Sequence, residues 1–335
     1  YVITKQEEDL PKRETLKEKR VLELPQSFNY QLDEPNVLVL DMAKFRIDDG
    51  KWQAEDEILK VDRKIRDHFG MEYRGGEMLQ PWYAKKLGYE DKGKVDLAFE
   101  FYIDQIPSGP IELAIERPQN FKVKLNGHDV NVSKQNNNWW VDICFKRLPI
   151  KRDCLVQGRN IIELSTVYNQ GIDLEAIYIL GDFGVNIKGT KKIIGKLPEK
   201  LSVGNIVTQG LPFYSGKIQY KVPINYLTGS GERVYLSFDR IDGACIKVIG
   251  KSGSSKIIAW KPYEADITDL LDNSKEITIE VILTRRNTFG PLHQIPAIAP
   301  AYGPGNFVTE GRLFTTKYML LPAGLTTSPK IIIKE

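Results

Sequence analysis

Apolar side chains occupy every second position in several short runs of this chain. The pattern is clear at residues 97–103, 111–116 and 121–127, and comparable runs recur between residue 217 and residue 335. A period of two, with one apolar face and one charged face, is typical of antiparallel strands in a β-sandwich. We therefore predict an all-β protein of short antiparallel strands. Asn126-Gly127 predicts a hairpin turn in which both central residues have positive φ.

Two segments depart from simple alternation. Residues 36–47 (NVLVLDMAKFRI) are almost continuously apolar and predict one buried strand. Near residues 54–69 the period becomes helical, with Gly70 as a stop signal, so we predict one helix inserted into the first sandwich. The apolar stripe of that helix comprises Ile58, Val61, Ile65 and Phe69. We expect the adjacent His68 to lie at the surface or to have its hydrogen bonds satisfied.

The length of 335 residues exceeds a typical single core and predicts two sandwich domains. Residues 1–20 are strongly charged, which indicates a linker or mobile end. The basic, Gly- and Pro-containing stretch at residues 188–204 separates the two blocks of strands. We place the first sandwich at 21–195 and the second at 196–335. The chain begins with Tyr1 and shows no signal peptide, so we expect it to be part of a longer or processed polypeptide.

Composition excludes some classes of function. The net charge of +3 arises from well-mixed signs without a polybasic stripe, so we expect no nucleic-acid partner. No apolar run approaches the roughly 20 residues that span a bilayer, so we expect no membrane partner. Cys144, Cys154 and Cys245 show no CxxC spacing, and we expect free thiols.

Motifs for catalysis or metal binding are weak. No zinc spacing and no GxSxG elbow occur, and the 44 acidic residues single out no catalytic pair. Asp182-Phe183-Gly184 matches a kinase tripeptide without the rest of that signature, and we interpret it as a strand end and turn. We predict no catalytic residue and no cofactor. The sequence leaves a structural calcium ion open, although no loop has a calcium spacing.

Aromatic residues in segments rich in Asn, Gly and Ser give the most useful chemical signal. Flat rings stack on the C–H faces of sugars, while amide, imidazole and carboxyl groups bond to the hydroxyls. The alternative is that these rings cap the two cores, and in the Trp139-Trp140 pair one ring should face inward and the other outward. The carbohydrate-binding candidates are Trp139, Trp140, Tyr214, Trp260, Asn287, Phe289 and His293.

Residues 285–296 (RRNTFGPLHQIP) carry three of these candidates around a stiff Gly290-Pro291 corner. The corner follows a predicted buried strand, so we expect it to direct the three side chains toward one end of the second sandwich. Two interpretations stay open at this point. The loop either forms a small sugar pocket or packs against a neighbouring domain.

Several phrases, taken in order, resemble the C-terminal sandwich region of large bacterial glycoside hydrolases, and especially their alpha-L-rhamnosidase-like relatives. They are NVLVLDMAKFRIDDGKWQ, ELAIERPQNFKVKLNGHDV, WWVDICFKRLPI, GRNIIELSTVYNQGIDLEAIYILGDFGV, GLPFYSGKIQYKV and NTFGPLH. The accessory domains of such enzymes resemble the sugar-binding jelly-roll domain of glycoside hydrolase family 2. The likeness covers most of residues 20–335, with Leu292 standing where the commoner motif has a first His.

The resemblance implies two jelly-roll, galactose-binding-like sandwiches that accompany a catalytic domain of the same polypeptide. It implies a non-catalytic accessory portion that binds an oligo- or polysaccharide or supports that domain, and it favours an extracellular or cell-surface bacterial location. Nothing in the chain resembles the eight-fold strand–helix repeat of a catalytic barrel. Two alternatives stay open: an intact sandwich-fold enzyme with a cluster of His, Tyr and Arg, and a purely structural or adhesive module.

Overall fold

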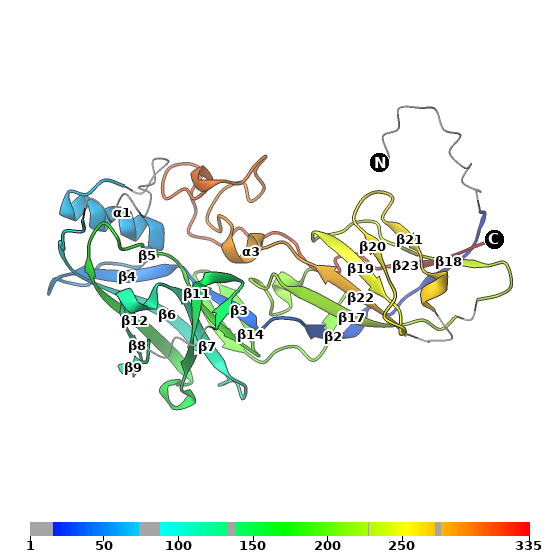
Figure 1. Ribbon diagram of the computed structural model, residues 1–335, viewed down its shortest axis with the longest axis horizontal. Helices are drawn as coiled ribbons and strands as arrows, with labels where there is room; N and C mark the ends of the chain where they lie inside the picture. Colours follow the sequence, from blue (N-terminus) through cyan, green and yellow to red (C-terminus); the bar gives the residue numbers. More distant parts are fainter. Residues whose placement is uncertain (1–15, 74–87, 133–137, 227, 272–275) are drawn as a thin grey trace.

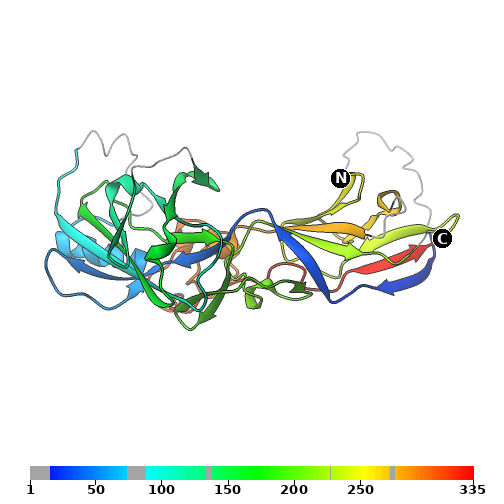
Figure 2. The same ribbon diagram turned by 90° about the horizontal axis from the view of Figure 1, so that it is seen from below.

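The computed structural model describes residues 16–73, 88–132, 138–226, 228–271 and 276–335. Nearly all of its regular structure is antiparallel β-sheet, arranged as two lobes that follow one another along the long axis of the molecule (Figure 1). A quarter turn shows the same two lobes, joined end to end (Figure 2). The predicted all-β sandwich fold is confirmed.

The first sandwich pairs a five-stranded sheet, in the order β10-β11-β7-β13-β3, with an eight-stranded sheet. The larger sheet runs β14-β15-β6-β12-β8-β9, and β4 pairs with both β6 and β5. The strands are β3 (Asn36–Leu40), β4 (Met42–Ile47), β5 (Asp56–Glu57), β6 (Gly93–Ile103), β7 (Ile111–Glu116), β8 (Lys122–Leu125), β9 (His128–Val130), β10 (Trp139–Trp140), β11 (Asp142–Ile150), β12 (Gly158–Tyr168), β13 (Ile177–Gly181), β14 (Gly184–Lys188) and β15 (Lys191–Gly195).

The second sandwich pairs a four-stranded sheet, β1-β23-β18-β21, with a six-stranded sheet, β16-β2-β17-β22-β19-β20. Its strands are β1 (Glu18–Glu23), β2 (Ser27–Leu32), β16 (Leu201–Ser202), β17 (Lys217–Pro223), β18 (Arg233–Ser237), β19 (Cys245–Ile249), β20 (Ser255–Ile258), β21 (Glu264–Asp266), β22 (Glu276–Ile282) and β23 (Lys330–Lys334). Short 3₁₀ turns occur at Pro118–Asn120, Arg152–Cys154, Ile206–Thr208, Thr268–Leu270 and Pro304–Asn306.

The N-terminal strands belong to the second sandwich, which differs from the expected boundaries. β1 pairs with β23 and β2 pairs with β17, so residues 18–32 lie with the C-terminal half of the chain. β1 is an edge strand with mostly exposed side chains, and such a strand needs little apolar content. The charged sequence of β1 is therefore compatible with an edge strand, although by composition alone it resembles a linker. Residues 1–15 of the predicted linker lie outside the described residues.

The predicted single strand at residues 36–47 is two strands in different sheets. β3 pairs with β13 in the smaller sheet, and β4 pairs with β6 in the larger one. The chain changes sheets at Asp41, which is only 4% exposed. Both strands are buried, so the residues on either side of Asp41 are mostly apolar. The sequence therefore gives no change of pattern that marks the end of β3 and the start of β4.

Helix α1 (Ile58–Phe69) confirms the predicted insertion, although it begins four residues later than expected. Its N-cap is Glu57, whose carboxylate accepts hydrogen bonds from the backbone N–H groups of Leu59 and Lys60 at 3.1 Å. Gly70 ends the helix at φ 63°. His68 is exposed, as expected.

A long excursion from the second sandwich lies against the first. We call residues 285–321 the crossing segment; it contains the short helix α3 (Arg286–Phe289) and lies beside the first lobe between α1 and α3 in Figure 1. Leu292, Phe289 and Leu320 of this segment pack with the first hydrophobic core. The Gly290-Pro291 corner therefore directs its neighbours to the first sandwich rather than to the second. The loop packs on that sandwich, and a sugar pocket formed by the loop stays a prediction.

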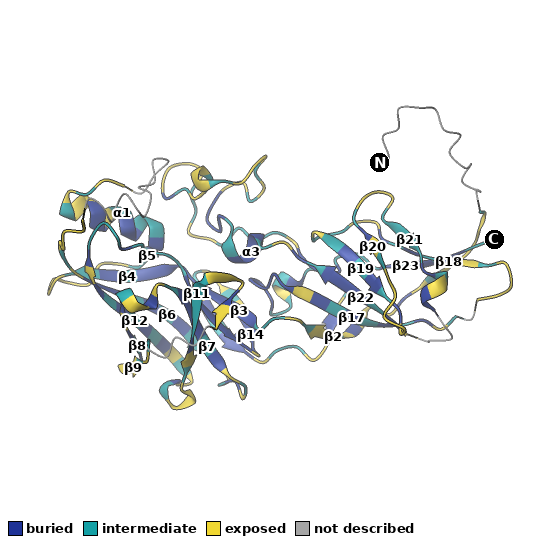
Figure 3. Cartoon of the chain, viewed as in Figure 1, coloured by how far each residue is buried: buried dark blue, intermediate teal, exposed yellow. Residues whose placement is uncertain are grey.

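Burial follows the faces where paired sheets meet (Figure 3). The Asn126-Gly127 hairpin is confirmed, with φ values of 49° and 82°. All three cysteines are free thiols, as expected. Within the part of the chain that the structure describes, no helix has the length and apolarity to cross a bilayer.

Candidate functional site

A cavity of about 470 Å³ lies between the first sandwich and the crossing segment. The sandwich contributes residues from β3, β5, β7, β11 and β13, and the crossing segment contributes residues 288–294 and 306–308. Cavities of this size fall within the range of small-molecule sites, roughly 300–1,000 Å³. The fold therefore joins parts of the chain that are more than 200 residues apart into one candidate site.

Aromatic rings form one wall of the cavity. Phe289 stacks on Phe145, with ring centroids 5.3 Å apart and an interplanar angle of 20°. Tyr178 meets both rings at centroid distances of 5.3 and 5.4 Å. Trp140 completes the group from behind, 5.3 Å from Phe289. Such offset and edge-to-face pairs stabilise by about 0.5–1.5 kcal/mol beyond burial alone, so they hold the wall rigid.

Asp41 is the centre of a buried hydrogen-bond group at the floor of the cavity. The Tyr318 hydroxyl donates to its Oδ1 at 2.5 Å, and Nε2 of His293 lies 3.2 Å from its Oδ2. Nδ1 of His293 lies 2.9 Å from the carbonyl oxygen of Thr315. A carbonyl only accepts hydrogen bonds, so both ring nitrogens face acceptors, which favours the protonated imidazolium.

The electrostatics agree with that assignment. Burial alone would lower the pKa of His293, but the hydrogen bond and charge of Asp41 raise it above its ordinary value. For Asp41 the opposite balance holds: burial favours the neutral form, and His293 outweighs it to lower the pKa. The pair is therefore a buried ion pair that joins the sandwich to the crossing segment.

Two further buried groups surround Asp41. Lys192 on β15 is 1% exposed, and its Nζ has no hydrogen-bond partner among the described residues. Burial lowers its pKa, while the charge of Asp41 acts in the opposite direction. Burial also raises the pKa of Glu57 to about 7, opposed by the N–H groups that it caps. The carboxylate of Asp41 is thus the strongest of the charges that raise the pKa of both Lys192 and His293.

The remaining carboxyl groups of the lining are Glu116, Asp142 and Glu175. Asp142 is exposed and accepts the backbone N–H of Cys144 at 3.0 Å. Val141, immediately before it, has φ 60°. A β-branched residue in this conformation is strained by about 1–3 kcal/mol, so the β10–β11 turn is held in place by its surroundings.

Three of the seven sequence candidates come together here. Phe289 and His293 line the cavity, and the side chain of Trp140 lies behind the aromatic wall. The adjacent Trp139 is 48% exposed whereas Trp140 is 4% exposed, so the expected inward and outward orientation of this pair is confirmed. Asn287 is buried and bonds both the carbonyl and the N–H of Leu321, which fixes the course of the crossing segment.

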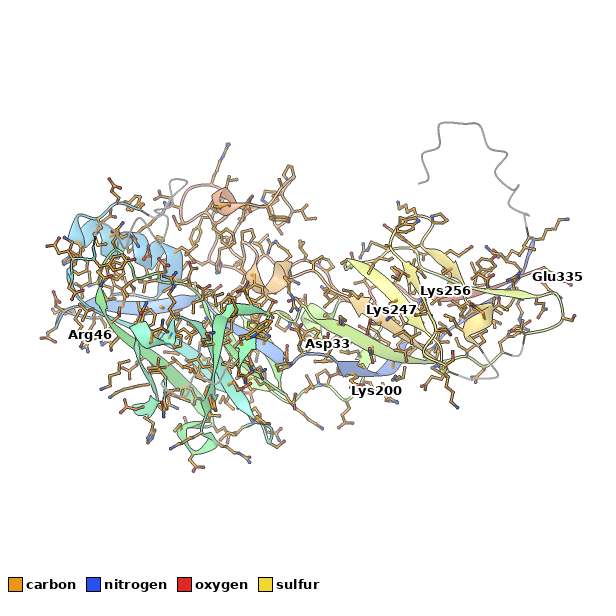
Figure 4. The ribbon with its side chains drawn as sticks, in the orientation of Figure 1. Asp33, Arg46, Lys200, Lys247, Lys256 and Glu335 are labelled. Carbon is orange, nitrogen blue, oxygen red and sulfur yellow. The ribbon has the colours of Figure 1, made fainter. Side chains whose placement is uncertain are left out.

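The other two candidates lie on the second sandwich. Tyr214 is buried, with its hydroxyl 2.7 Å from the carbonyl oxygen of Lys217 and 3.0 Å from the carboxylate of Asp33. Asp33 is visible between the two lobes in Figure 4. Trp260 is 75% exposed in the loop after β20, the strand that carries the labelled Lys256 (Figure 4). Sugar binding by any of the seven stays a prediction.

Sequence reasoning missed Asp41, Glu57 and Lys192. Asp41 had a usable signal, since it is the one charge inside the apolar run at residues 36–42. Lys192 had no such signal, because a lysine in a strand is predicted to lie at the protein surface. No cluster of three or more His, Cys, Asp or Glu side chains suited to a metal ion occurs in the described ranges.

Comparison with known proteins finds partial structural likenesses to glycoside hydrolases. A rhamnosidase from Novosphingobium sp. PP1Y shares 14% identity over 71% of this chain and 23% of its own, with a TM-score of 0.29. A glycosyl hydrolase family 2 member from Bacteroides cellulosilyticus DSM 14838 shares 12% sequence identity over 75% of this chain and 32% of its own, with a TM-score of 0.26. A beta-D-glucuronidase from Dictyoglomus thermophilum shares 14% sequence identity over 74% of this chain and 38% of its own, with a TM-score of 0.25.

The matched region is thus less than half of the length of each of these hydrolases. No protein-family profile matches the sequence, and no curated protein matches it. At these identities and TM-scores, the likenesses assign neither a family nor an activity to this chain.

Proposed function

We propose that this chain is a non-catalytic accessory portion of a glycoside hydrolase, which binds carbohydrate in the cavity and supports a catalytic domain of the same polypeptide. The lining of the cavity carries this proposal, because partly exposed rings stand beside hydrogen-bond acceptors. Phe145 and Phe289 are partly exposed rings of the lining and suit apolar contact with sugar C–H groups, and the carboxylates of Glu116 and Asp142 can accept hydrogen bonds from hydroxyl groups. The ordered sequence resemblance supports the same class of protein.

Hydrolysis by the two most buried carboxyl groups of the cavity, Asp41 and Glu57, is disfavoured because both are engaged by the fold. Hydrolysis of a glycosidic bond requires two carboxyl groups that face the substrate. Asp41 bonds Tyr318 and His293, and Glu57 bonds two N–H groups at the start of α1. Neither is free to move to a substrate without breaking buried hydrogen bonds.

Titration calorimetry of the whole chain against mono- and oligosaccharides tests the proposal. Phe307 lines the cavity and is 41% exposed, so Phe307→Ala should weaken binding without unfolding the chain. Trp52→Ala is the matched control, because Trp52 is also 41% exposed but lies outside the cavity lining. Equal affinity of the two variants, or no binding by the native chain, would contradict a sugar site here.

A second candidate, an intact sandwich-fold glycosidase, is favoured by one observation. Glu57, with its pKa raised to about 7, stands near the ionised Asp41, which resembles the division between acid and base in glycosidases. Hydrolysis of aryl glycosides by the chain alone, lost in Glu57→Gln, would establish this alternative. If the chain alone leaves aryl glycosides unhydrolysed, the glycosidase alternative is excluded in favour of the accessory role.

A further inference from the structure

One side chain joins the crossing segment both to the first sandwich and to itself. Nε2 of His293 lies 3.2 Å from Oδ2 of Asp41 on the sandwich, and Nδ1 lies 2.9 Å from the carbonyl oxygen of Thr315 on the returning arm of the segment. His293 is 6% exposed, so the fold rather than bulk water supplies both partners. The ring therefore closes the segment into a loop and fastens that loop to the sandwich.

Both contacts need the protonated ring. A carboxylate or carbonyl oxygen only accepts hydrogen bonds, whereas a neutral imidazole carries a single N–H. Loss of the proton therefore leaves one ring nitrogen with its lone pair against an acceptor, whichever tautomer forms. In a buried site no solvent compensates for the lost bond. The proton on His293 thus decides whether the loop is fastened.

Titratable side chains face His293 and Asp41 from the elements packed around them. They are Glu55 before β5, Glu57 of β5, Lys60 of α1 next to the Phe314 ring, Tyr178 of β13, Lys192 of β15 and Tyr318 of the crossing segment. Burial lowers the pKa of His293, but the bond and charge of Asp41 and the charge of Glu57 outweigh it. Glu57, with its own pKa raised by burial to about 7, gains its charge near neutral pH and so delays the loss of the His293 proton. Lys192 favours the ionised form of Asp41 and thereby the fastened state.

The part of the segment between its two buried ends rests lightly on the first lobe. Leu292 and Tyr318 pack with the first core, whereas every residue at 295–308 is partly or fully exposed. We call residues 293–317 the strap. Residues 306–308 of the strap line the cavity, so the cavity is uncovered when the strap is released.

A second ion pair joins the strap to helix α1. Arg63 and Glu310 approach to 3.7 Å, but their side chains are 39% and 80% exposed. Exposed pairs contribute little to stability, because water solvates both charges. The buried pair of His293 and Asp41 is therefore the stronger of the two.

Unmatched polar atoms favour release of the strap. Within the described residues, Nε and Nη1 of Arg286, Oε1 of Gln294 and Oγ1 of Thr309 are buried without a hydrogen-bond partner. Buried polar atoms are bonded in the great majority of cases, and each unmatched one keeps an uncompensated cost of desolvation. Gln294 and Thr309 belong to the strap, and Nη2 of Arg286 donates to the carbonyl oxygen of Ala297 within it at 2.9 Å. Opening returns such atoms to water, so the closed state depends on a few strong bonds.

We propose that the strap is a pH-sensitive cover of the cavity, with the imidazolium of His293 as its latch. While His293 is protonated and Asp41 is ionised, residues 306–308 stay against the cavity. Deprotonation of His293 releases the strap between its fixed ends, Leu292 and Tyr318. The latch controls access to the cavity and does not depend on which ligand enters.

The direction of the response follows from the two partners. The pKa of His293 is raised, so the latch is fully present below the unfolded value near 6.5 and is lost as the pH rises through the folded value. The pKa of Asp41 is lowered, so the latch is also lost when the pH falls through the folded value of that carboxyl. The cavity is therefore covered at intermediate pH and opens toward alkaline pH.

Titration of the three imidazole rings by ¹H–¹⁵N NMR tests the latch in the native chain. His68 and His128 are exposed and serve as internal references. We expect His293 to keep its proton to a higher pH than either reference. A midpoint for His293 at or below those of His68 and His128 overturns the latch.

Hydrogen exchange followed by mass spectrometry, from pH 6 to pH 9, tests the release. After correction for the intrinsic pH dependence of exchange, protection of the strap should fall roughly tenfold as His293 deprotonates, the effect of one hydrogen bond of about 1.4 kcal/mol. The N–H groups to follow are those of Ile295 and Thr315, which donate to the carbonyl oxygens of Leu313 and His293 at 2.8 and 2.9 Å. Peptides from β17 and β22 should show no such change.

A variant assigns the release to His293. In His293→Gln the strap should exchange at pH 6 as it does in the native chain at pH 9. His128→Gln is the matched control, since His128 is exposed on β9, and it should behave as the native chain. The titration of the native chain stands as a test even if His293→Gln does not fold.

Two further results would overturn the latch. One is strap protection that stays the same from pH 6 to pH 9, and the other is equal protection in His293→Gln and the native chain at pH 6. No saccharide enters these measurements, so failure of the latch and failure of carbohydrate binding are distinguishable.

Discussion

The two sandwiches use the same alternating strands but differ in what they bury. On the strands of the second sandwich, Glu280 is buried and accepts a hydrogen bond from Gln219 of the neighbouring strand at 2.7 Å. The first sandwich buries Asp41 and Lys192, and Asp41 finds its partners on the crossing segment. Glu280 is thus satisfied within its own sheet, whereas Asp41 requires residues from the other end of the chain.

This difference teaches where the candidate site comes from. A buried carboxylate stabilises a fold only when its charge and hydrogen bonds are matched. The partners of Asp41 are His293 and Tyr318, and the same residues hold the crossing segment over the cavity. The polar group that the first core must satisfy is therefore also the group that holds the crossing segment over the candidate site.

Replacement of Asp41 by Asn should have the largest effect. The change removes the ion-pair partner of the protonated His293 and the strongest of the negative charges that act on the buried Lys192. A broken buried pair costs about 3–5 kcal/mol. Hydrogen exchange followed by mass spectrometry should show loss of protection in the first lobe and little change in β17 or β22.

Asp239→Asn is the control for that experiment. Asp239 is 63% exposed and pairs with Lys330 on the second lobe, so its loss should cost about 0–1 kcal/mol. If both substitutions cost the same, the buried pair does not hold the crossing segment on the first sandwich as described.

Phe289→Ala should have the next largest effect. The ring contacts Trp140, Phe145 and Tyr178 across the interface of the first lobe with the crossing segment. Because it is only half-buried, we expect a loss of about 2–3 kcal/mol, which is below the roughly 3–5 kcal/mol of fully buried aromatic truncations. Urea unfolding monitored by tryptophan fluorescence measures the change. An unchanged first-lobe transition would show that the aromatic wall contributes no stability.

The contribution of His293 should depend on pH. Its folded-state pKa is raised, so its stabilisation is fully present below the unfolded value near 6.5 and is lost as the pH rises through the folded value. We expect about 1.5 kcal/mol at low pH, the scale of hydrogen bonds to charged groups.

Unfolding curves of the native chain and His293→Gln, recorded from pH 5 to pH 9, should therefore converge toward high pH. Asp41 works in the opposite direction, since its lowered pKa gives stability that is lost as the pH falls toward acid values. Curves that stay parallel over the whole range would mean that His293 is not charged in the folded protein.

Trp260→Ala should have the smallest effect on stability. The ring is 75% exposed on the second lobe, so its removal should change the free energy of unfolding by less than about 0.5 kcal/mol. Its effect on saccharide binding distinguishes one site from two, because the cavity lies against the first lobe. A loss of affinity equal to that of Phe307→Ala would place a second sugar contact on the second lobe.

Local pattern predicted the elements well and their assembly less well. The alternating runs, the Asn126-Gly127 hairpin and the stripe of α1 were readable because each is set by residues within one turn or strand. The membership of β1 in the second lobe was not readable, since any exposed edge offers the same backbone donors and acceptors. For the site, the sequence named Phe289 and His293 as candidates. The prediction that they lie at one end of the second sandwich was wrong, because they lie against the first.

The sequence by itself determined which faces of the strands are apolar, where the chain turns and that both lobes are β-sandwiches. Only the tertiary structure decided that Asp41 would meet His293, 252 residues along the chain, and that the crossing segment would close the cavity. The physical reason is the range of the two effects. Side-chain alternation acts between neighbours, whereas the pairing of a buried charge depends on which distant segment reaches it before water is excluded.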